Sequence, residues 1–370
     1  MEGLRVAFLE IVPANNIATA TFTSRLFIRE GSMKGIVLLG EGELAVKEFP
    51  DPKPGPGEVV VRVKTAAICG SDIYVYHSRK KWREDKPDVI AGHEPAGIVE
   101  EVGEGVTLVK PGDRVTVYHY IGCGKCKQCL AGYWQWCPET KGLGTHTHGA
   151  DADFLLVKEQ NCFVMPEELS FVDGAFMACA AGTTYSALNK LQPNGTTSLV
   201  VIGLGPVGLS GVLMAKAMGA QVIAVGRRKI RLDLAGELGA DQVLDADDPE
   251  LPNTIRNLLP YGADMVYETS GAPEAHKLML QILRRGGKAC MVAGRGPTDS
   301  LSASVIIAKQ LTIHGSFVLP IWMVPDMAAF IVRHKLPFEK MVTHRFKIEQ
   351  ADEAFRLFDS GECGKVVFEW

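Results

Sequence analysis

The sequence predicts an α/β protein in which a small barrel-like β domain precedes a domain with a doubly wound parallel sheet. Two observations carry this prediction. Short β-type runs broken by Gly and Pro occupy residues 33–163, and from about residue 180 apolar strand-like runs alternate with helical stretches. The length of 370 residues, at roughly 150 residues per domain, fits two or three domains.

In the first part of the chain, apolar runs bounded by turn residues predict the strands. The Pro- and Gly-rich segment 51–57 is a turn, and it leads into the first of three predicted strands, at 59–63, 98–103 and 113–117. Residues 33–38 predict an earlier strand. We expect residues 1–32 to be an upstream extension that activity does not need.

In the second part, strands alternate with helices. An apolar strand at 198–202 precedes a Gly-rich turn and a helix at 209–218, and the further strands are expected at 221–225, 241–244, 263–267 and 288–292. After about residue 317 this rhythm ends. The expected division is therefore a β domain, a sheet domain and a return to the first domain, at residues 33–180, 181–317 and 318–370.

Composition excludes several classes of protein. The net charge of −4 lacks the concentrated basic field of a nucleic-acid binder. No apolar run approaches the ~18 residues of a membrane helix, and 46% hydrophobic with 22% charged residues argues against global disorder. Residues 1–32 lack the uninterrupted apolar stretch of a secretory signal. We therefore expect a cytoplasmic protein that acts on a small molecule.

A glycine-rich turn predicts a dinucleotide site. Gly203, Gly205 and Gly208 match G-x-G-x-x-G, and here the motif follows an apolar strand and opens a helix, which is the context that supports it. The first glycine permits the tight turn, the second lets the backbone approach a pyrophosphate, and the third allows close packing of helix and strand. A glycine turn that binds nothing is the competing interpretation.

The end of the next strand favours NADP over NAD. NAD-binding versions usually place Asp or Glu there for the ribose 2′-OH, whereas this chain has Gly226 followed by Arg227 and Arg228. The glycine removes the repulsion of a 2′-phosphate, and either arginine can clamp it through two donors. These basic residues can also be a solvated helix face.

Four cysteines predict a structural zinc lobe at about residues 120–140. Cys123, Cys126, Cys129 and Cys137 offer four thiolates from one Gly-rich loop, the closed tetrahedral set of structural zinc. An iron–sulfur cluster is the alternative, since Pro138 follows the last cysteine, but the final gap is longer than in ferredoxins.

Three further residues, Cys69, His93 and Cys179, lie on separate segments. Two Cys and one His form a known catalytic zinc set with an open fourth position. Singly, each has an ordinary structural interpretation, and spacing alone does not join them. Cys162, Cys290 and Cys363 are expected to be packing thiols.

From residue 33 to the C-terminus, the chain resembles the zinc-dependent medium-chain alcohol dehydrogenase family. The resemblance rests on motifs in the same order: Cys69-Gly70-Ser71-Asp72, Gly92-His93-Glu94, the four-cysteine lobe, Cys179, the glycine turn and Gly364-Lys365-Val366-Val367. It implies a GroES-like β-barrel domain and a Rossmann domain, two zinc ions per subunit, and a homodimer or homotetramer.

The resemblance also implies residue roles. Cys69, His93 and Cys179 would bind catalytic zinc, with Glu94 near the metal. Asp72 would orient His93, and Ser71 would bind the substrate hydroxyl and begin proton removal. At the remaining matched positions, Thr183 and Val207 would pack on the nicotinamide. Lys365 would lie near the pyrophosphate.

The chain departs from the family at Tyr74, where many members carry a histidine as the next proton carrier. Tyrosine carries protons poorly near neutral pH, because its reference pKa is about 10. The relay would then run through His77, water or the cofactor ribose. Five aromatic or histidine residues on loops are candidates for the substrate pocket, or for simple packing: Trp82, His119, Tyr120, Trp134 and His146.

The expected activity is hydride transfer between an alcohol and a nicotinamide cofactor, with aldehyde or ketone reduction in reverse. A polyol or amino-alcohol dehydrogenase would share every motif except the pocket, although the polyol branch typically has Glu as its third ligand. A zinc-independent quinone or enoyl reductase would share only the dinucleotide motif. A non-enzymatic nucleotide-binding protein would not need the Cys/His/Cys set.

Overall fold

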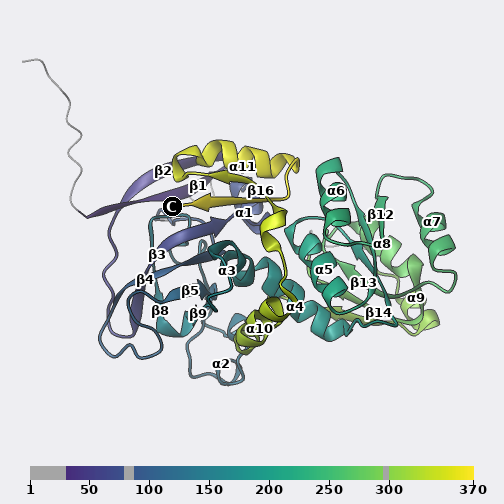
Figure 1. Ribbon diagram of the computed structural model, residues 1–370, viewed down its shortest axis with the longest axis horizontal. Coiled ribbons are helices and arrows are strands. Elements are labelled where there is room, and N and C mark those ends of the chain that lie inside the picture. Colours follow the sequence, from purple (N-terminus) through teal and green to yellow (C-terminus); the bar gives the residue numbers. More distant parts are fainter. Residues whose placement is uncertain (1–30, 79–86, 295–299) are drawn as a thin grey trace, which may run out of the picture.

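The computed structural model describes residues 31–78, 87–294 and 300–370. The chain forms two bodies side by side: one combines the first strands with the C-terminal segment, and the other holds the middle of the chain (Figure 1). This arrangement confirms the predicted α/β class. The expectations for the upstream extension before Gly31 and for Trp82 fall outside the described residues.

A seven-stranded sheet forms the first body, in the order β16-β17-β3-β4-β5-β9, with β8 paired to β3. Its C-terminal strand pairs antiparallel with one of the earliest, so that Val367 lies opposite Ala67. The strands are β3 (Glu58–Ala67), β4 (Pro95–Val102), β5 (Arg114–Val117), β8 (Phe154–Lys158), β9 (Cys162–Val164), β16 (Val342–Phe346) and β17 (Lys365–Glu369). Val59, Val61 and Val63, alternate residues of β3, belong to one apolar core.

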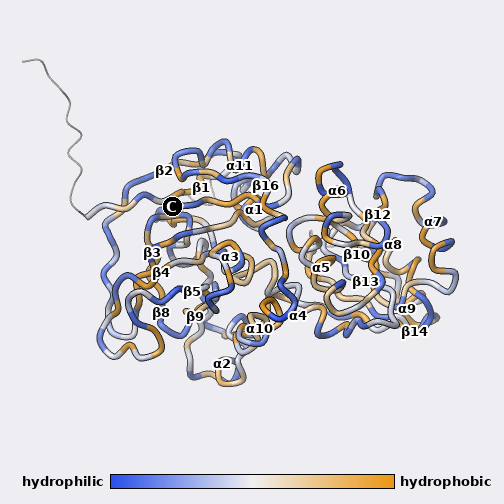
Figure 2. The backbone as a smooth tube through the Cα atoms, in the orientation of Figure 1, coloured by the Kyte–Doolittle hydropathy of each residue, from blue (hydrophilic) through white to orange (hydrophobic). Residues whose placement is uncertain are grey.

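A hairpin and four helices complete this body. The hairpin begins at Ser32, one residue before the predicted strand. Helix α11 alternates exposed charged residues with buried ones, and Figure 2 shows both hydrophilic and hydrophobic stretches along it. These elements are β1 (Ser32–Gly40), β2 (Glu43–Pro50), α1 (Gly70–Tyr76), α2 (Lys127–Leu130), α3 (Phe171–Ala178) and α11 (Ala351–Ser360), with a small ladder of β6 (Tyr120–Ile121) and β7 (Lys141–Gly142).

A six-stranded parallel sheet forms the second body, in the order β12-β11-β10-β13-β14-β15. The chain starts at the central β10, builds outward to β12, and then crosses back to β13 on the other side. Ligands of such sheets bind at this switch point, beyond the carboxyl ends of the strands. The strands are β10 (Ser198–Ile202), β11 (Gln221–Gly226), β12 (Gln242–Asp245), β13 (Ala263–Glu268), β14 (Leu283–Met291) and β15 (Thr312–Gly315).

Helices cover this sheet, and two more, α4 and α10, lie between the bodies (Figure 1). Helix α5 starts at Pro206, earlier than the predicted Leu209, because proline is favoured in the first helical turn. The helices are α4 (Ala180–Leu191), α5 (Pro206–Ala217), α6 (Lys229–Glu237), α7 (Leu251–Leu258), α8 (Pro273–Ile282), α9 (Ala303–Lys309) and α10 (Val324–His334).

Short 3-10 helices connect several of these elements in the described residues. The 3-10 turns are Trp134–Trp136, Glu159–Asn161, Ile321–Met323, Phe338–Met341 and Ile348–Gln350. Within the described residues, no helix is both long enough and apolar enough to span a bilayer.

Candidate metal centres and dinucleotide site

The start of α1 positions three of the predicted site residues. Cys69 is the N-cap residue, and the Asp72 carboxylate at the third helical position accepts a hydrogen bond from the Cys69 backbone N–H at 2.8 Å. This reciprocal cap holds the turn. The other carboxylate oxygen of Asp72 lies 3.1 Å from Nδ1 of His93. Asp72 therefore orients both Cys69 and His93, as a buried carboxylate between them.

Four potential ligand atoms converge beside this turn. One atom from each of Cys69, His93, Glu94 and Cys179 lies within 4.8 Å of those of the others. His93 and Glu94 lie just before β4, and Cys179 is the single residue between α3 and α4. The tertiary fold thus brings together residues from three segments that are distant in the chain.

The electrostatics of this cluster favour an anionic sulfur. A hydrogen bond from Cys179 and the nearby His93 hold the pKa of Cys69 well below its usual range, despite burial. Burial lowers the pKa of His93, but Asp72 and Cys69 outweigh it and hold that pKa well above its usual range. Thiolate and imidazole are donors that zinc prefers. Cys69, His93 and Cys179 supply three of them, so a tetrahedral zinc would have a fourth position for a further ligand.

Lys365 lies next to this cluster. Its Nζ atom is 2.6 Å from Oε2 of Glu94, and both side chains are fully buried. Burial raises the pKa of Glu94 to about 8 against the opposing effect of Lys365. In the structure the Lys365 ammonium pairs with Glu94, and its expected place near a pyrophosphate stays a prediction.

The four cysteines of the lobe also converge. Their Sγ atoms lie within 4.8 Å of one another, on the loop between β6 and β7 that carries α2. Backbone N–H groups point at the sulfurs: those of Cys123 and Glu139 at Cys137, and that of Cys129 at Cys126, each at 3.4 Å. All nine cysteines of the chain are free of disulfides. Four thiols with such N–H donors fit a closed tetrahedral metal site.

The glycine turn has the geometry that a dinucleotide site requires. Gly203 adopts a φ of 95°, in the region that favours glycine. A Cβ on Gly208 would lie 1.8 Å from the Gly203 carbonyl oxygen, whereas a Cβ on Gly205 would meet no atom within 4 Å. The turn is therefore packed tightly underneath and open at Gly205. The N-terminus of α5 follows directly and offers free N–H groups to an anion.

Hydrogen bonds connect helix α4, which follows Cys179, to the glycine turn through residues that sequence reasoning missed. Thr184 of α4 donates to the Val207 carbonyl at 2.9 Å, and its hydroxyl lies 3.2 Å from that of Tyr267. Thr269 donates to the Gly203 carbonyl at 2.8 Å. Threonines inside ordinary helix and strand-end sequences carry no motif, so no sequence signal identified them. The neighbouring Thr183 is buried.

The basic residues after β11 lie at the surface. Gly226 is buried beside Leu204. Arg227 and Arg228 are both more than half exposed, and each pairs with a carboxylate: Arg227 with Asp247 at 2.8 Å and Arg228 with Glu362 at 3.4 Å. Exposed pairs of this kind are weak, so a phosphate can compete for either guanidinium.

Of the proton-relay candidates, only Ser71 lies at the cluster. Its Oγ atom is 3.5 Å from Nε2 of His93, and its side chain is exposed. Tyr74 is 77% exposed. His77 instead pairs with Asp359 at 3.0 Å, at the surface. The structure therefore does not bring His77 to the cysteine–histidine cluster.

Two of the loop residues predicted as pocket candidates lie against the cluster. The His119 ring is 5.1 Å from that of His93, and Tyr120 is 4.7 Å from His119. Burial, with help from His93, lowers the pKa of His119 to about 3, so its ring is neutral. His146 is exposed in the loop after β7, where its Nδ1 accepts from Gly142.

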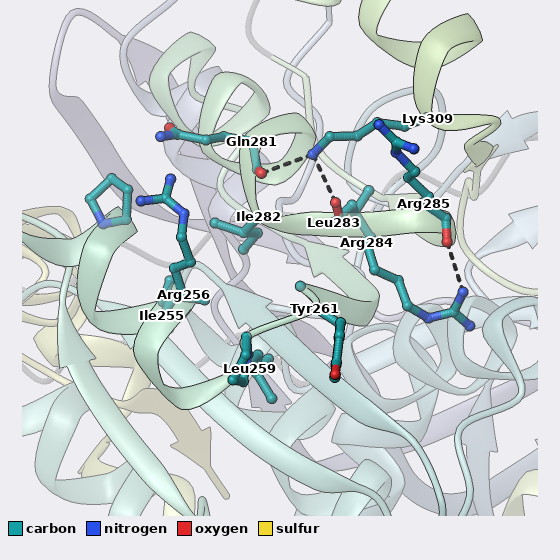
Figure 3. A pocket seen from close by; sticks show the side chains of 13 residues that line it. Ile255, Arg256, Leu259, Tyr261, Gln281, Ile282, Leu283, Arg284, Arg285 and Lys309 are labelled. Atoms are coloured by element: carbon teal, nitrogen blue, oxygen red, sulfur yellow. Dashed lines mark hydrogen bonds between the residues drawn. The ribbon is translucent and has the colours of Figure 1, made fainter.

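A separate cavity of about 190 Å³ lies at the opposite edge of the second sheet. Its lining residues lie at the starts of β13 and β14 and on the neighbouring helices (Figure 3). Lys309 is one of its basic residues, but its ammonium donates to the carbonyls of Leu280, Gln281 and Leu283. The Lys309 ammonium therefore caps the C-terminal end of α8. The residues that line the cavity include no cysteine and no histidine.

Two family models match the chain. The model described as "Alcohol dehydrogenase GroES-like domain" matches residues 55–167, and "Zinc-binding dehydrogenase" matches residues 206–333. The zinc-type alcohol dehydrogenase-like protein YphC of Escherichia coli (strain K12) is 35% identical, over 91% of this chain and 98% of its own. An L-threonine 3-dehydrogenase of Symbiobacterium thermophilum is 34% identical, over 87% of this chain and 93% of its own.

Solved structures agree with these matches. An alcohol dehydrogenase of E. coli CFT073 in complex with NADH has a TM-score of 0.83 and 26% identity, and covers 92% of this chain and 100% of its own. A zinc-binding dehydrogenase of Sinorhizobium meliloti 1021 bound to NADP has a TM-score of 0.81 and 27% identity, with the same coverage. The chain belongs to the zinc-dependent medium-chain alcohol dehydrogenase family, and it is an oxidoreductase of the alcohol dehydrogenase type.

Proposed function

We propose that the chain is a zinc- and nicotinamide-dependent dehydrogenase that interconverts an alcohol with its aldehyde or ketone. The convergence of Cys69, His93 and Cys179 carries this proposal. Cys179 begins the turn into α4, and α4 is hydrogen-bonded to the glycine turn through Thr184. The proposed metal and dinucleotide sites are thus connected by one helix, as hydride transfer between their ligands requires.

The residues present fit both groups. Cys69, His93 and Cys179 would hold the catalytic zinc, and the four lobe cysteines would hold the structural one. Zinc bound at the first site supplies Lewis-acid polarisation of an alcohol or carbonyl oxygen. Bound nicotinamide supplies the redox chemistry, while the protein fixes distance and face. A zinc-independent reductase would have no use for these ligands, which argues against that alternative.

Each neighbouring residue then has a defined task. Asp72 holds the His93 ring through Nδ1 and keeps Nε2 directed at the cluster. Ser71 Oγ, beside that Nε2 and open to solvent, accepts the proton of the substrate hydroxyl and passes it on to water. The glycine turn and the N-terminus of α5 bind the pyrophosphate. Glu94, paired with Lys365, stays close to the metal ligands without solvent contact.

We propose NADP as the preferred cofactor. Gly226 leaves no carboxylate at the position that binds a 2′-OH, and the exposed Arg227 and Arg228 can exchange their surface carboxylates for a phosphate. The relatives include structures with NADH and with NADP. The ratio of kcat/KM with NADP and NAD tests the proposal, and a strong preference for NAD would overturn it.

An amino-alcohol or polyol substrate is the second candidate, and relatives named L-threonine 3-dehydrogenase favour it. Simple alcohols remain compatible with Cys179 in the place where polyol enzymes typically have Glu. A panel of alcohols, diols and amino alcohols, run with both cofactors, separates these candidates.

The zinc proposal is tested by combining metal analysis with turnover. The purified protein should contain two zinc ions per chain, one for each cluster. Cys69→Ala and His93→Ala should each lose one zinc and all measurable turnover, while retaining the second zinc and the fold. His334→Ala, at the exposed end of α10, serves as the control. Near-normal activity in a folded His93→Ala protein would refute the mechanism.

A further inference from the structure

His119 touches both sides of the cysteine–histidine cluster. Its ring centroid is 5.1 Å from that of His93, and its Nδ1 lies 2.7 Å from the carbonyl oxygen of Ala178, the residue before Cys179. The residue comes from the segment between β5 and β6, and its side chain is 4% exposed. Its nitrogens are not among the converging ligand atoms of the cluster. His119 is therefore a neighbour of the metal ligands rather than one of them.

The hydrogen bond to Ala178 determines what His119 offers to a ligand. A carbonyl oxygen only accepts, so Nδ1 carries the hydrogen and donates. In a neutral imidazole the other nitrogen is then an acceptor with a free lone pair. No hydrogen bond to Nε2 is found among the described residues, and Nε2 is not one of their fully buried, unpartnered atoms, so it retains access to open space. A ligand that supplies a donor can therefore pair with this lone pair.

Tyr120 adds a second polar group at the same place. Its ring is half-buried, 4.7 Å from His119 and 5.6 Å from Phe317. Burial raises the pKa of its phenol, against the opposing effect of His93. The surroundings of the proposed metal thus combine an imidazole acceptor, a phenol and one apolar ring. A site for plain alkyl chains would need no such acceptor.

We propose that His119 is a specificity-determining residue and that its Nε2 accepts a hydrogen bond from a hydroxyl or ammonium group on the carbon next to the one oxidised. The preferred substrates are then vicinal diols and 1,2-amino alcohols rather than simple alkanols. His119 lies against the ring of His93 and the backbone just before Cys179. Only a group a few bonds from the reacting oxygen can therefore reach it. This inference rests on the proposed dehydrogenase function.

The reaction itself stays the same. The substrate carbinol loses two electrons and one hydrogen as hydride to the oxidised cofactor, and its hydroxyl proton passes to solvent. A carbonyl forms, and the neighbouring hydroxyl or ammonium keeps all its bonds. His119 takes no proton in this scheme. It selects the substrate by pairing with a group that does not react.

Two substitutions separate the two nitrogens of His119. His119→Asn keeps an N–H donor for the Ala178 carbonyl, but its shorter side chain leaves no acceptor at the position of Nε2. His119→Gln can place its amide oxygen near that position. The wild-type enzyme should prefer butane-2,3-diol or L-threonine over butan-2-ol. His119→Asn should reduce this ratio of kcat/KM by about tenfold, mainly through KM, as the loss of one hydrogen bond predicts. His119→Gln should retain most of it.

The controls address folding and metal content. Each variant should keep two zinc ions and the wild-type melting temperature, and His334→Asn on the exposed end of α10 should leave the ratio unchanged. Calorimetric binding of butane-2,3-diol to the zinc-loaded protein with reduced cofactor gives a readout that does not depend on turnover. This binding should weaken in His119→Asn.

The outcomes distinguish the two levels of inference. A wild-type protein that contains zinc but oxidises none of the alcohols would overturn the proposed function and this inference with it. A wild-type enzyme that oxidises butan-2-ol as efficiently as the diol, or a His119→Asn variant with an unchanged ratio, would overturn only the role of His119. Preference for the diol identifies a hydroxyl as the recognised group, and preference for L-threonine identifies an ammonium.

Discussion

Lys365 and Glu94 form an ion pair without any exposed surface, with Nζ 2.6 Å from Oε2. The Lys365 ammonium also lies 5.6 Å from the centre of the Phe176 ring. Above about pH 8, where Glu94 is ionised, Lys365→Met should lower the free energy of unfolding by about 3–5 kcal/mol, because it leaves a buried carboxylate without its partner. Urea denaturation of the zinc-loaded protein measures this change.

The double variant Lys365→Met with Glu94→Gln tests the cause of that loss. It replaces both charges with neutral groups of similar size, and it should recover most of the lost stability. If Lys365→Met alone changed the free energy of unfolding by less than about 1 kcal/mol, this would contradict a paired, ionised Lys365.

Asp151 predicts a specific dependence of stability on pH. It is fully buried, and neither carboxylate oxygen has a hydrogen-bond partner among the described residues. Burial first, and Asp72 next, raise the pKa of Asp151 well above its usual value. The native state therefore holds a proton that the unfolded chain loses above its pKa of about 3.9. This stabilising contribution is complete below that pH and is lost as the pH rises through the folded pKa.

Asp151→Asn removes this titration. Between about pH 5 and pH 8, its stability relative to the wild type should increase with pH, by at most about 1.4 kcal/mol per unit. Denaturation midpoints of both proteins across this range give the difference. Asp326→Asn, an exposed change in the first turn of α10, is the matched control. A constant difference between wild type and Asp151→Asn would show that Asp151 is ionised in the native protein.

Arg227 is the residue at which the proposed preference for NADP over NAD can be tested. Its side chain is 66% exposed, and its pair with Asp247 is a surface pair of little energetic value. Arg227→Ala should therefore leave the fold intact. We expect kcat/KM with NADP to fall at least about tenfold, as the loss of a charge-assisted contact predicts, with little change for NAD. Lys229→Ala, two residues on and also exposed, is the control. An equal effect on both cofactors would argue against a 2′-phosphate contact.

The four-cysteine lobe predicts a separable metal site. Cys126 caps α2 through its sulfur, which accepts from the Cys129 N–H. Cys126→Ser should remove one zinc ion per chain and lower the melting temperature, because structural zinc contributes directly to folding. Limited proteolysis should then cut within the lobe first. Cys363→Ala, a buried thiol outside both clusters, should keep both ions.

Sequence reasoning predicted well where the information is local. The lobe cysteines lie close together along one loop, and the glycine turn follows its strand directly, so spacing and residue type identify each as a candidate site. The capping role of Asp72 is also local, because it lies three residues after Cys69. The resemblance to a family supplied the grouping of Cys69, His93 and Cys179, which spacing alone did not.

Only the tertiary structure decided the contacts between distant segments. It placed Lys365 against Glu94, joined α4 to the glycine turn through Thr184, and set His119 beside His93. Local sequence determines strands, turns and caps because these depend on neighbouring residues. Contacts across the fold depend on how the sheet orders its strands and how loops meet at their ends. A buried charge or an unpaired imidazole therefore becomes visible only when the chain is folded.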